Sequence, residues 1–299
     1  MILFVGGTGT LGRLSIPHLL ARGQSVRVLT RELARARDLQ SIGVEIAEGD
    51  VLDAASLQRA MVGVRTVISA MHGFTGTGKY TPQSVDRDGN LRLFAAARTA
   101  GVEHVVMLSI QSATADHPME LFRMKFAAEE ALRASTLAWT ILRPTAYMET
   151  WATLVGVPLL TKGATRIFGG GRNPINFVSA ADVAQFVALA ASDSSLRDTQ
   201  IDIGGPENLT MHQVVATFQS VSGQNGTVNA VPLPVLRVAS QLMRLFNPTL
   251  ARQMQGAIVM DTRNMAFDAA PTRRQYPAIG STSFADVARQ YLQPGRKQR

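Results

Sequence analysis

Short apolar runs alternate with longer amphipathic segments through the first half of the chain. The apolar runs predict strands at 1–5, 25–30, 44–48, 65–69, 104–109 and 137–143, and helical spacing predicts helices at 14–21, 53–61, 84–100 and 120–134. Strands separated by helices favour a parallel sheet with right-handed crossovers and helices on both faces. We therefore expect an α/β fold with a Rossmann-type doubly wound parallel sheet.

The second half of the chain returns once to this sheet and then becomes mostly helical. A strand at 175–178, a helix at 180–191 and a strand at 200–203 predict the return, and Thr210 is placed to cap a helix that ends near 222. We expect a core domain over 1–155, rejoined by 174–204, and a smaller substrate-side lobe over 156–299. The apolar segment 232–246 fits lobe core, a cleft wall or a partner interface. Arg237 and Arg244 supply only part of the basic face that a membrane-surface helix needs.

A glycine-rich turn joins the first strand to the first helix. Gly6 and Gly9 permit a tight turn and a close backbone approach to a pyrophosphate, and Gly12 permits close packing of helix on strand. The helix N-terminus would then face the phosphates. The turn therefore predicts a dinucleotide site, with further contacts expected from Thr8, Thr10 and Leu11.

The end of the second strand indicates which dinucleotide binds. An NAD site has Asp or Glu there, whereas this chain has Arg31, followed by Arg35 and Arg37. A guanidinium pairs with a 2′-phosphate, which a carboxylate would repel. We therefore expect NADP(H), bound through Arg31 and Arg35, whereas Arg37 fits a solvated helix face.

Ligands of such sheets bind beyond the carboxyl ends of the strands. Several residues of this chain follow the predicted strands directly and are expected near the cofactor: Asp50, Val51, Ala70, Met71, His72, Ser109 and Pro144.

Composition narrows the class of protein. The 299 residues are 46% hydrophobic and 17% charged, which is typical of a globular protein with a sizeable core. The absence of cysteine excludes disulfides and thiolate catalysis and is compatible with a cytoplasmic location. No His, Asp or Glu set has metal-ligand spacing, and no apolar run reaches the roughly 18 residues of a membrane span. We expect no signal peptide, because the first apolar run is short and ends at glycines.

The net charge of +8 does not by itself indicate nucleic-acid binding. Arginine supplies nearly all of it, since lysine occurs only at 79, 125, 162 and 297. The arginines are scattered, and aromatic residues make up only 6% of the chain, so a clustered basic stripe with interleaved aromatics is missing. The basic run at 296–299 fits a solvated terminus.

Short motifs occur in an order that resembles a known family. They are Gly6–Gly12, Gly49-Asp50, Val85-Asp86 with Gly89-Asn90, Leu142–Pro144, Phe177-Val178 with Ala181–Ala184, and Ile203–Glu207 with Leu209-Thr210. This order resembles the atypical short-chain dehydrogenase/reductases of the NmrA-like, NAD(P)H-binding group. The tract 204–210 is similar to the branch with the Ycf39-like proteins and the 39-kDa subunit of complex I. The resemblance extends to about residue 215.

One departure from that pattern bears on the chemistry. Short-chain reductases usually have Tyr-x-x-x-Lys, but here the tract begins with Leu121 and ends with Lys125. The resemblance implies that Lys125 reaches the nicotinamide ribose and, as in isoflavone-reductase-like relatives, acts as the acid/base. The alternative is a solvated lysine paired with Glu129, four residues later on the same helix.

Two functions follow as hypotheses. The first is an NADPH-dependent reductase of a small apolar carbonyl, quinone or conjugated alkene, with His72, Tyr147 and Trp151 near the substrate. The second is a non-catalytic NADP(H)-binding redox sensor, regulator or assembly factor. In either case we expect a monomer or homodimer that binds a small molecule, without nucleic acid or a membrane span.

Overall fold

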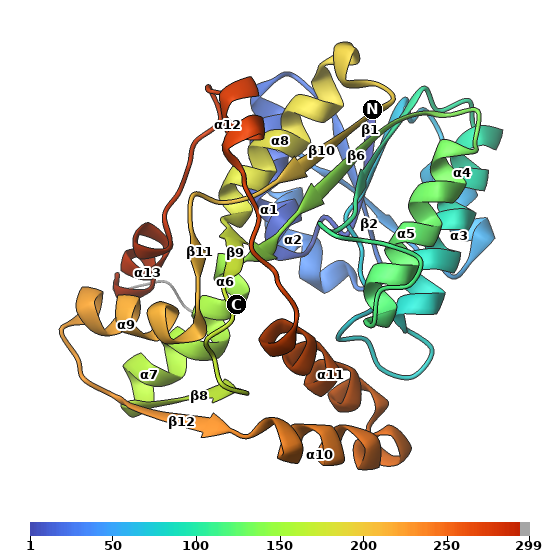
Figure 1. Ribbon diagram of the computed structural model, residues 1–299. Coiled ribbons are helices and arrows are strands. Elements are labelled where there is room, and N and C mark those ends of the chain that lie inside the picture. Colours follow the sequence, from blue (N-terminus) through green and yellow to red (C-terminus); the bar gives the residue numbers. More distant parts are fainter. Residues whose placement is uncertain (294–299) are drawn as a thin grey trace. The chain divides into compact units, whose positions relative to one another are not determined.

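The computed structural model describes residues 1–293, so the basic run 296–299 lies outside the described residues. The chain forms two compact units (Figure 1). The first unit contains Met1–Pro144 and Val183–Asp202. The second contains Thr145–Asp182 and the chain from Ile203 onward.

A seven-stranded sheet forms the centre of the first unit, within residues 1–293, in the order β10-β6-β5-β4-β1-β2-β3. Its strands are β1 (Ile2–Val5), β2 (Val26–Thr30), β3 (Glu45–Glu48), β4 (Thr66–Ser69), β5 (His104–Leu108), β6 (Ala138–Pro144) and β10 (Thr199–Ile203). All neighbours from β6 to β3 pair in parallel, with Val5 of β1 opposite Leu29 of β2 and Ser69 of β4. The predicted parallel sheet is thus confirmed, and its strand order reverses at β1, where ligands of such sheets bind.

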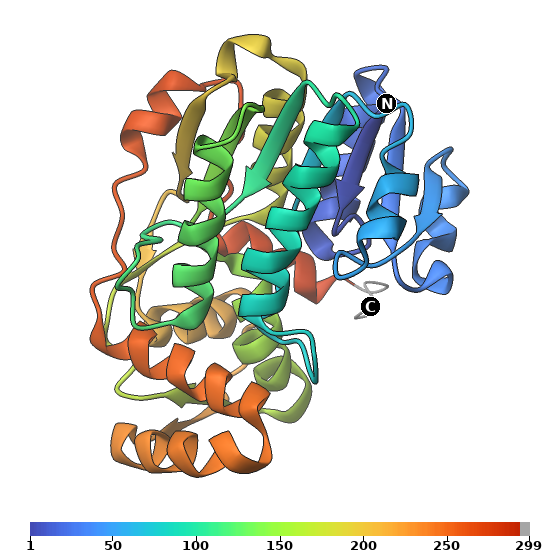
Figure 2. The same ribbon diagram turned by 90° about the vertical axis from the view of Figure 1, so that its right-hand side faces the viewer.

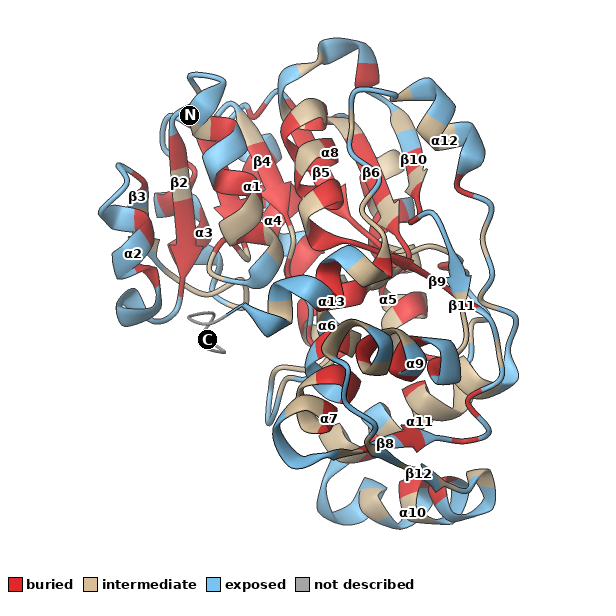
Figure 3. Cartoon of the chain, turned by 90° about the vertical axis from the view of Figure 1, so that its left-hand side faces the viewer, coloured by how far each residue is buried: buried red, intermediate tan, exposed pale blue. Residues whose placement is uncertain are grey.

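Helices cover both faces of this sheet (Figures 2 and 3). One face packs under α3 (Ala54–Ala60), α4 (Asn90–Thr99) and α5 (Glu120–Arg133), and the other carries α1 (Thr10–Ala21) and α8 (Ala180–Ser192). Short helices η1 (Leu33–Ala36) and α2 (Arg37–Gln40) follow β2. Asp53 caps α3 as predicted, by accepting a hydrogen bond from the N–H of Ala55 at 3.0 Å.

The helix predicted over 84–100 begins earlier and is not uniform. Thr81 and Ser84 form a capping box, and Pro82 begins a π-helical segment, η2 (Pro82–Gly89), that continues directly into α4. Periodicity alone does not distinguish such a segment from an α-helix, and π-helical turns are frequent at functional sites.

The second unit consists mainly of helices with two small sheets. Its helices are α6 (Met148–Trp151), η3 (Ala152–Gly156), α7 (Val157–Lys162), α9 (Met211–Ser222), α10 (Leu233–Phe246), α11 (Pro248–Thr262), α12 (Ala270–Gln275) and α13 (Phe284–Leu292). One sheet has the order β11 (Asn208–Leu209), β9 (Ile175–Val178), β7 (Ala146–Tyr147), and the other pairs β12 (Thr227–Val231) in parallel with β8 (Ala164–Phe168). Phe177, Phe218 and Phe284 meet edge to face in its core.

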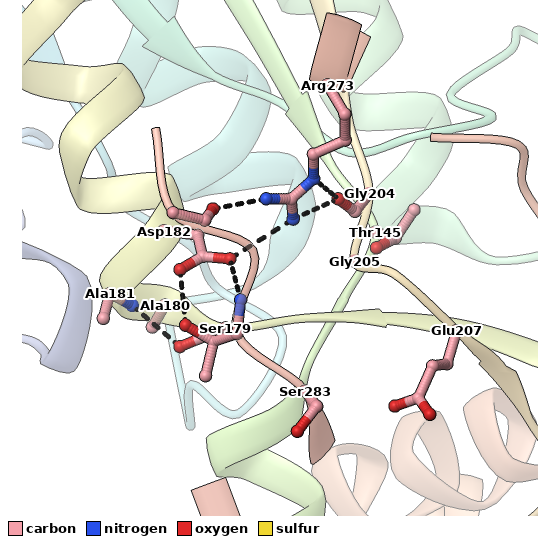
Figure 4. A network of polar contacts seen from close by, with 12 residues as sticks. Thr145, Ser179, Ala180, Ala181, Asp182, Gly204, Gly205, Glu207, Arg273 and Ser283 are labelled. Carbon is pink, nitrogen blue, oxygen red and sulfur yellow. Dashed lines mark hydrogen bonds and ion pairs between the residues drawn. The ribbon is translucent and has the colours of Figure 1, made fainter. Parts of the chain in front are cut away.

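A buried polar network fastens the C-terminal segment of the second unit (Figure 4). Arg273 of α12 pairs with Asp182 at 3.2 Å and donates to the carbonyl oxygen of Gly204 at 2.8 Å. Thr282 donates to the same carboxylate through its backbone N–H, at 2.9 Å, and its hydroxyl, at 2.7 Å. Because Asp182 is buried, these charge-assisted bonds fix the segment that leads into α13.

Among residues 1–293, the structure has no helix that is both long enough and apolar enough to cross a membrane.

Candidate functional site: a dinucleotide-binding edge

Two glycines around the turn between β1 and α1 are required by the packing of the protein's own backbone. Gly6 has φ +90°, and a Cβ there would lie 2.6 Å from the carbonyl oxygen of Ala70. A Cβ on Gly12 would lie 2.4 Å from the backbone of Gly7. These contacts bring the start of α1 close to the end of β1, so the packing predicted for Gly12 is observed.

Gly9 has a different environment. It precedes α1 with φ −81° and ψ 175°, angles that any residue can adopt, and provides no side-chain cap. Within 4 Å, a Cβ there would meet only the carbonyl oxygen of Gly6 among the described residues, at 3.4 Å. Of the other predicted contacts, Thr8 lies in the same turn and Thr10 and Leu11 begin α1, and all three are at least partly exposed. Gly9 therefore keeps open the space in front of the helix N-terminus, which suits a bound anion.

Arg31 lies directly after β2 and is exposed. Its guanidinium stacks on the ring of Tyr80, with Cζ 4.0 Å from the ring centroid. The Tyr80 hydroxyl donates to Asp50 Oδ2 at 2.7 Å, and Asp50 Oδ1 accepts from the N–H of Leu52 at 3.0 Å. The guanidinium of Arg31 at the end of β2 is thus held in place by a cation–π contact with Tyr80, which lies in a loop about 50 residues later in the chain.

The neighbouring arginines are used differently. Arg13 forms an ion pair with Asp38 and donates to the carbonyl oxygen of Arg35 at 2.6 Å. Arg35 itself is exposed, with its guanidinium 3.9 Å from the carboxylate of Glu32. Arg13 therefore links α1 to the segment after β2, and Arg35 remains accessible for a phosphate.

Lys125 of α5 is buried, so it is not the solvated residue considered as the alternative. Its Nζ donates to the carbonyl oxygens of Met71, at 2.7 Å, and Leu108, at 2.9 Å. The same atom lies 3.1 Å from Asp86 Oδ1, while Asp86 Oδ2 accepts from the N–H of Gly73 at 2.7 Å. One ammonium group thus joins the ends of β4 and β5 to η2.

Glu129 does not pair with Lys125. Its buried carboxylate accepts hydrogen bonds from the hydroxyl of Ser109 and from two nitrogens of Arg143, of which Nε lies 2.9 Å from Oε1. It also pairs with Arg133 at 3.1 Å. This cluster ties α5 to the ends of β5 and β6, next to Pro144. The hydroxyl of Ser109, expected near the cofactor, is therefore engaged with α5.

His72 follows Met71 in the loop after β4. Desolvation by the surrounding chain lowers the pKa of its imidazole, although His72 is an exposed residue. The carboxylate of Asp86 opposes this shift, and the ammonium of Lys125 reinforces it. His72 is therefore neutral at pH 7, when one ring nitrogen donates and the other accepts.

The two other predicted substrate residues belong to the second unit. Burial raises the pKa of the Tyr147 hydroxyl, and the nearby carboxylate of Glu149 raises it further, so Tyr147 stays protonated at neutral pH. Trp151 contacts Phe177 edge to face, with centroids 6.4 Å apart, and lines a small, mostly apolar pocket together with Met260.

Sequence reasoning missed two residues of the candidate site. Asp86 appeared only as part of a family motif, without a role, although it is the carboxylate beside Lys125. Tyr80 gave no signal, because a single aromatic residue in a predicted loop has no periodic pattern.

Comparison with known proteins agrees with this architecture. The chain is 28% identical over 279 residues to the photosystem II assembly factor Ycf39 of Synechocystis, covering 92% of this chain and 85% of the relative. It is 28% identical over 225 residues to an NAD(P)H azoreductase of Xenophilus azovorans, covering 75% and 74%. The NADPH-dependent quinone oxidoreductase QOR2 of Escherichia coli, solved with NADPH, shares the fold with a TM-score of 0.79 at 22% identity, over 98% of this chain and 100% of that chain. The model of the NmrA-like family matches residues 1–269, and the chain therefore belongs to the NmrA-like family.

Proposed function

We propose that this protein binds NADP(H) and reduces a small apolar carbonyl, quinone or conjugated alkene. The observation that supports this best is the Arg31–Tyr80 stack after β2, beside a glycine turn whose Gly9 leaves the helix N-terminus open. The turn would hold the pyrophosphate, and Arg31, assisted by Arg35, the 2′-phosphate. The azoreductase and quinone oxidoreductase named above support a reductase by analogy.

The remaining predicted cofactor residues lie along the same edge of the first unit. Asp50 and Val51 follow β3, Ala70 and Met71 follow β4, and Pro144 ends β6. Bound NADPH would supply the hydride, so this chain needs to supply orientation and a proton. Lys125 would contact the ribose next to the nicotinamide.

We assign proton donation to Lys125. Two hydrogens of its ammonium go to the carbonyl oxygens of Met71 and Leu108. The carboxylate of Asp86, 3.1 Å from Nζ, pairs with the ammonium and favours its protonated form, which is the form that can donate a proton. Neutral His72 is the second candidate donor, and Tyr147 and Trp151 remain predicted substrate contacts.

A non-catalytic role is the second candidate. It is supported by Leu121, which stands where short-chain reductases have tyrosine, and by the similarity to the Ycf39 assembly factor. In that case NADP(H) binding would be tight and no substrate would be reduced.

Calorimetric titration with NADPH and NADH tests the cofactor assignment. We expect NADPH to bind at least about tenfold more tightly, since a hydrogen bond to a charged group is worth about 1.5–3 kcal/mol. Arg31→Ala should abolish the preference with little effect on NADH, whereas Arg37→Ala, an equally exposed control, should keep it. Equal affinities in the unchanged protein would refute the assignment.

NADPH oxidation against a panel of quinones and enones then separates the two functions. Turnover of any member supports the reductase. Tight NADPH binding with no turnover across the panel favours the non-catalytic role.

A further inference from the structure

Helix α10 exposes a stripe of large apolar side chains, defined here as Val235, Val238, Leu242, Leu245 and Phe246. Their exposed fractions run from 55% at Val235 and Leu242 to 82% at Leu245. Figure 3 shows exposed residues along much of this helix. The other large exposed apolar side chains of the described chain are scattered singly over different elements. A contiguous apolar patch marks an interaction surface, whereas scattered ones are ordinary.

The stripe is not the face that α10 uses to pack in its own unit. Leu236 and Ser240 are buried, four residues apart on one side of the helix, and α10 packs closely against α11. The first four stripe residues follow one another at intervals of three and four, Phe246 lies four residues after Leu242, and all five occupy a different side of the helix. The helix therefore has two apolar sides, only one of which is covered.

The charge around the stripe has a single sign. Residues 208–260 contain Arg237, Arg244 and Arg252 but no Asp or Glu, although the whole chain has 22 acidic residues. Arg237 and Arg244 are exposed, and their spacing of seven residues places them beside each other on the polar side of α10, about 80–100° round the helix from Leu245 at the edge of the stripe. Neither forms an ion pair with any described residue.

We propose that α10 binds the surface of an anionic phospholipid bilayer. The stripe would enter the boundary between head groups and acyl chains, and Arg237 and Arg244 would contact lipid phosphates. A second copy of the chain fits less well, because its residues 208–260 offer no carboxylate to pair with the arginines that flank the stripe. This inference is independent of the proposed cofactor binding, because α10 belongs to the second unit and the residues proposed to bind NADP(H) belong to the first.

Vesicle flotation of the full chain tests the proposal. We expect binding to vesicles of equimolar phosphatidylcholine and phosphatidylglycerol, and far weaker binding to phosphatidylcholine alone. Leu245→Ser and Phe246→Ser should each weaken binding about tenfold, from the apolar area that each buries. Val62→Ser, which changes a 69% exposed residue in the first unit, should bind unchanged.

A separate variant tests the contribution of the two arginines to vesicle binding. Replacing Arg237 and Arg244 together by Gln should weaken binding about 30-fold, since each basic residue near an anionic surface contributes about 1 kcal/mol. The far-ultraviolet circular dichroism and thermal midpoint should not change, because both side chains are exposed. Absence of binding to the anionic vesicles, or equal binding to both kinds, would overturn the proposal. A dimer would overturn it too: light scattering would show that the unchanged chain is dimeric and does not bind vesicles, and that Leu245→Ser converts it to a monomer.

Discussion

Replacing Lys125 by Met separates its structural contribution from its chemical one. The substitution removes two hydrogen bonds and leaves the fully buried Asp86 carboxylate with a hydrogen bond from the N–H of Gly73 but no cation beside it among the described residues. Breaking a buried ion pair from one side costs about 3–5 kcal/mol, chiefly because the remaining charge stays buried. We therefore expect Lys125→Met to lower the free energy of unfolding in urea by about that amount.

The double variant Lys125→Met, Asp86→Asn makes the test sharper. An asparagine oxygen can still accept from Gly73, and the uncompensated charge is gone, so about 2 kcal/mol or more of stability should return. Loss of a positioned acid lowers turnover about 10²–10⁴-fold, and this loss should persist in both variants. If the double variant is no more stable than the single one, the buried-charge argument is wrong. If it regains turnover, the proton comes from His72 or water.

Three further predictions concern Gly12 and Gly9 of the glycine turn and the pH dependence of stability. Gly12→Ala should destabilise the fold by about 3 kcal/mol, because its Cβ would lie 2.4 Å from the backbone of Gly7. Gly9→Ala should keep the thermal midpoint but weaken NADPH binding in calorimetry at least about tenfold; unchanged affinity would mean that no phosphate approaches Gly9. Burial lowers the pKa of His104 from 6.5 to about 4 in the folded chain. Between these pH values the unfolded chain binds a proton at this histidine and the folded chain does not, so stability falls as pH drops from 6.5 towards 4. Urea unfolding at both ends of this window should show a loss of about 3 kcal/mol from this group, which His104→Gln should largely remove; an equal loss in the variant would assign the effect to other groups.

The sequence alone determined the architecture of the first unit and predicted where along its sheet a dinucleotide would bind. Alternating strands and helices leave few topologies once crossovers must be right-handed, so the parallel sheet followed from periodicity. The glycine turn and Arg31 were also visible, because backbone freedom and a charge at a strand end are local properties. The cap at Asp53 is local in the same way.

Only the tertiary structure decided which side chains meet. Lys125 has acceptors 54 and 17 residues away, at Met71 and Leu108, and Arg273 reaches Asp182 across 91 residues. Periodicity reports which side of an element is buried, but not which element covers it, so neither pairing had a sequence signal. The same limit applies to α10. Its sequence shows apolar residues on two sides of the helix, and only its packing against α11 shows which side is left uncovered.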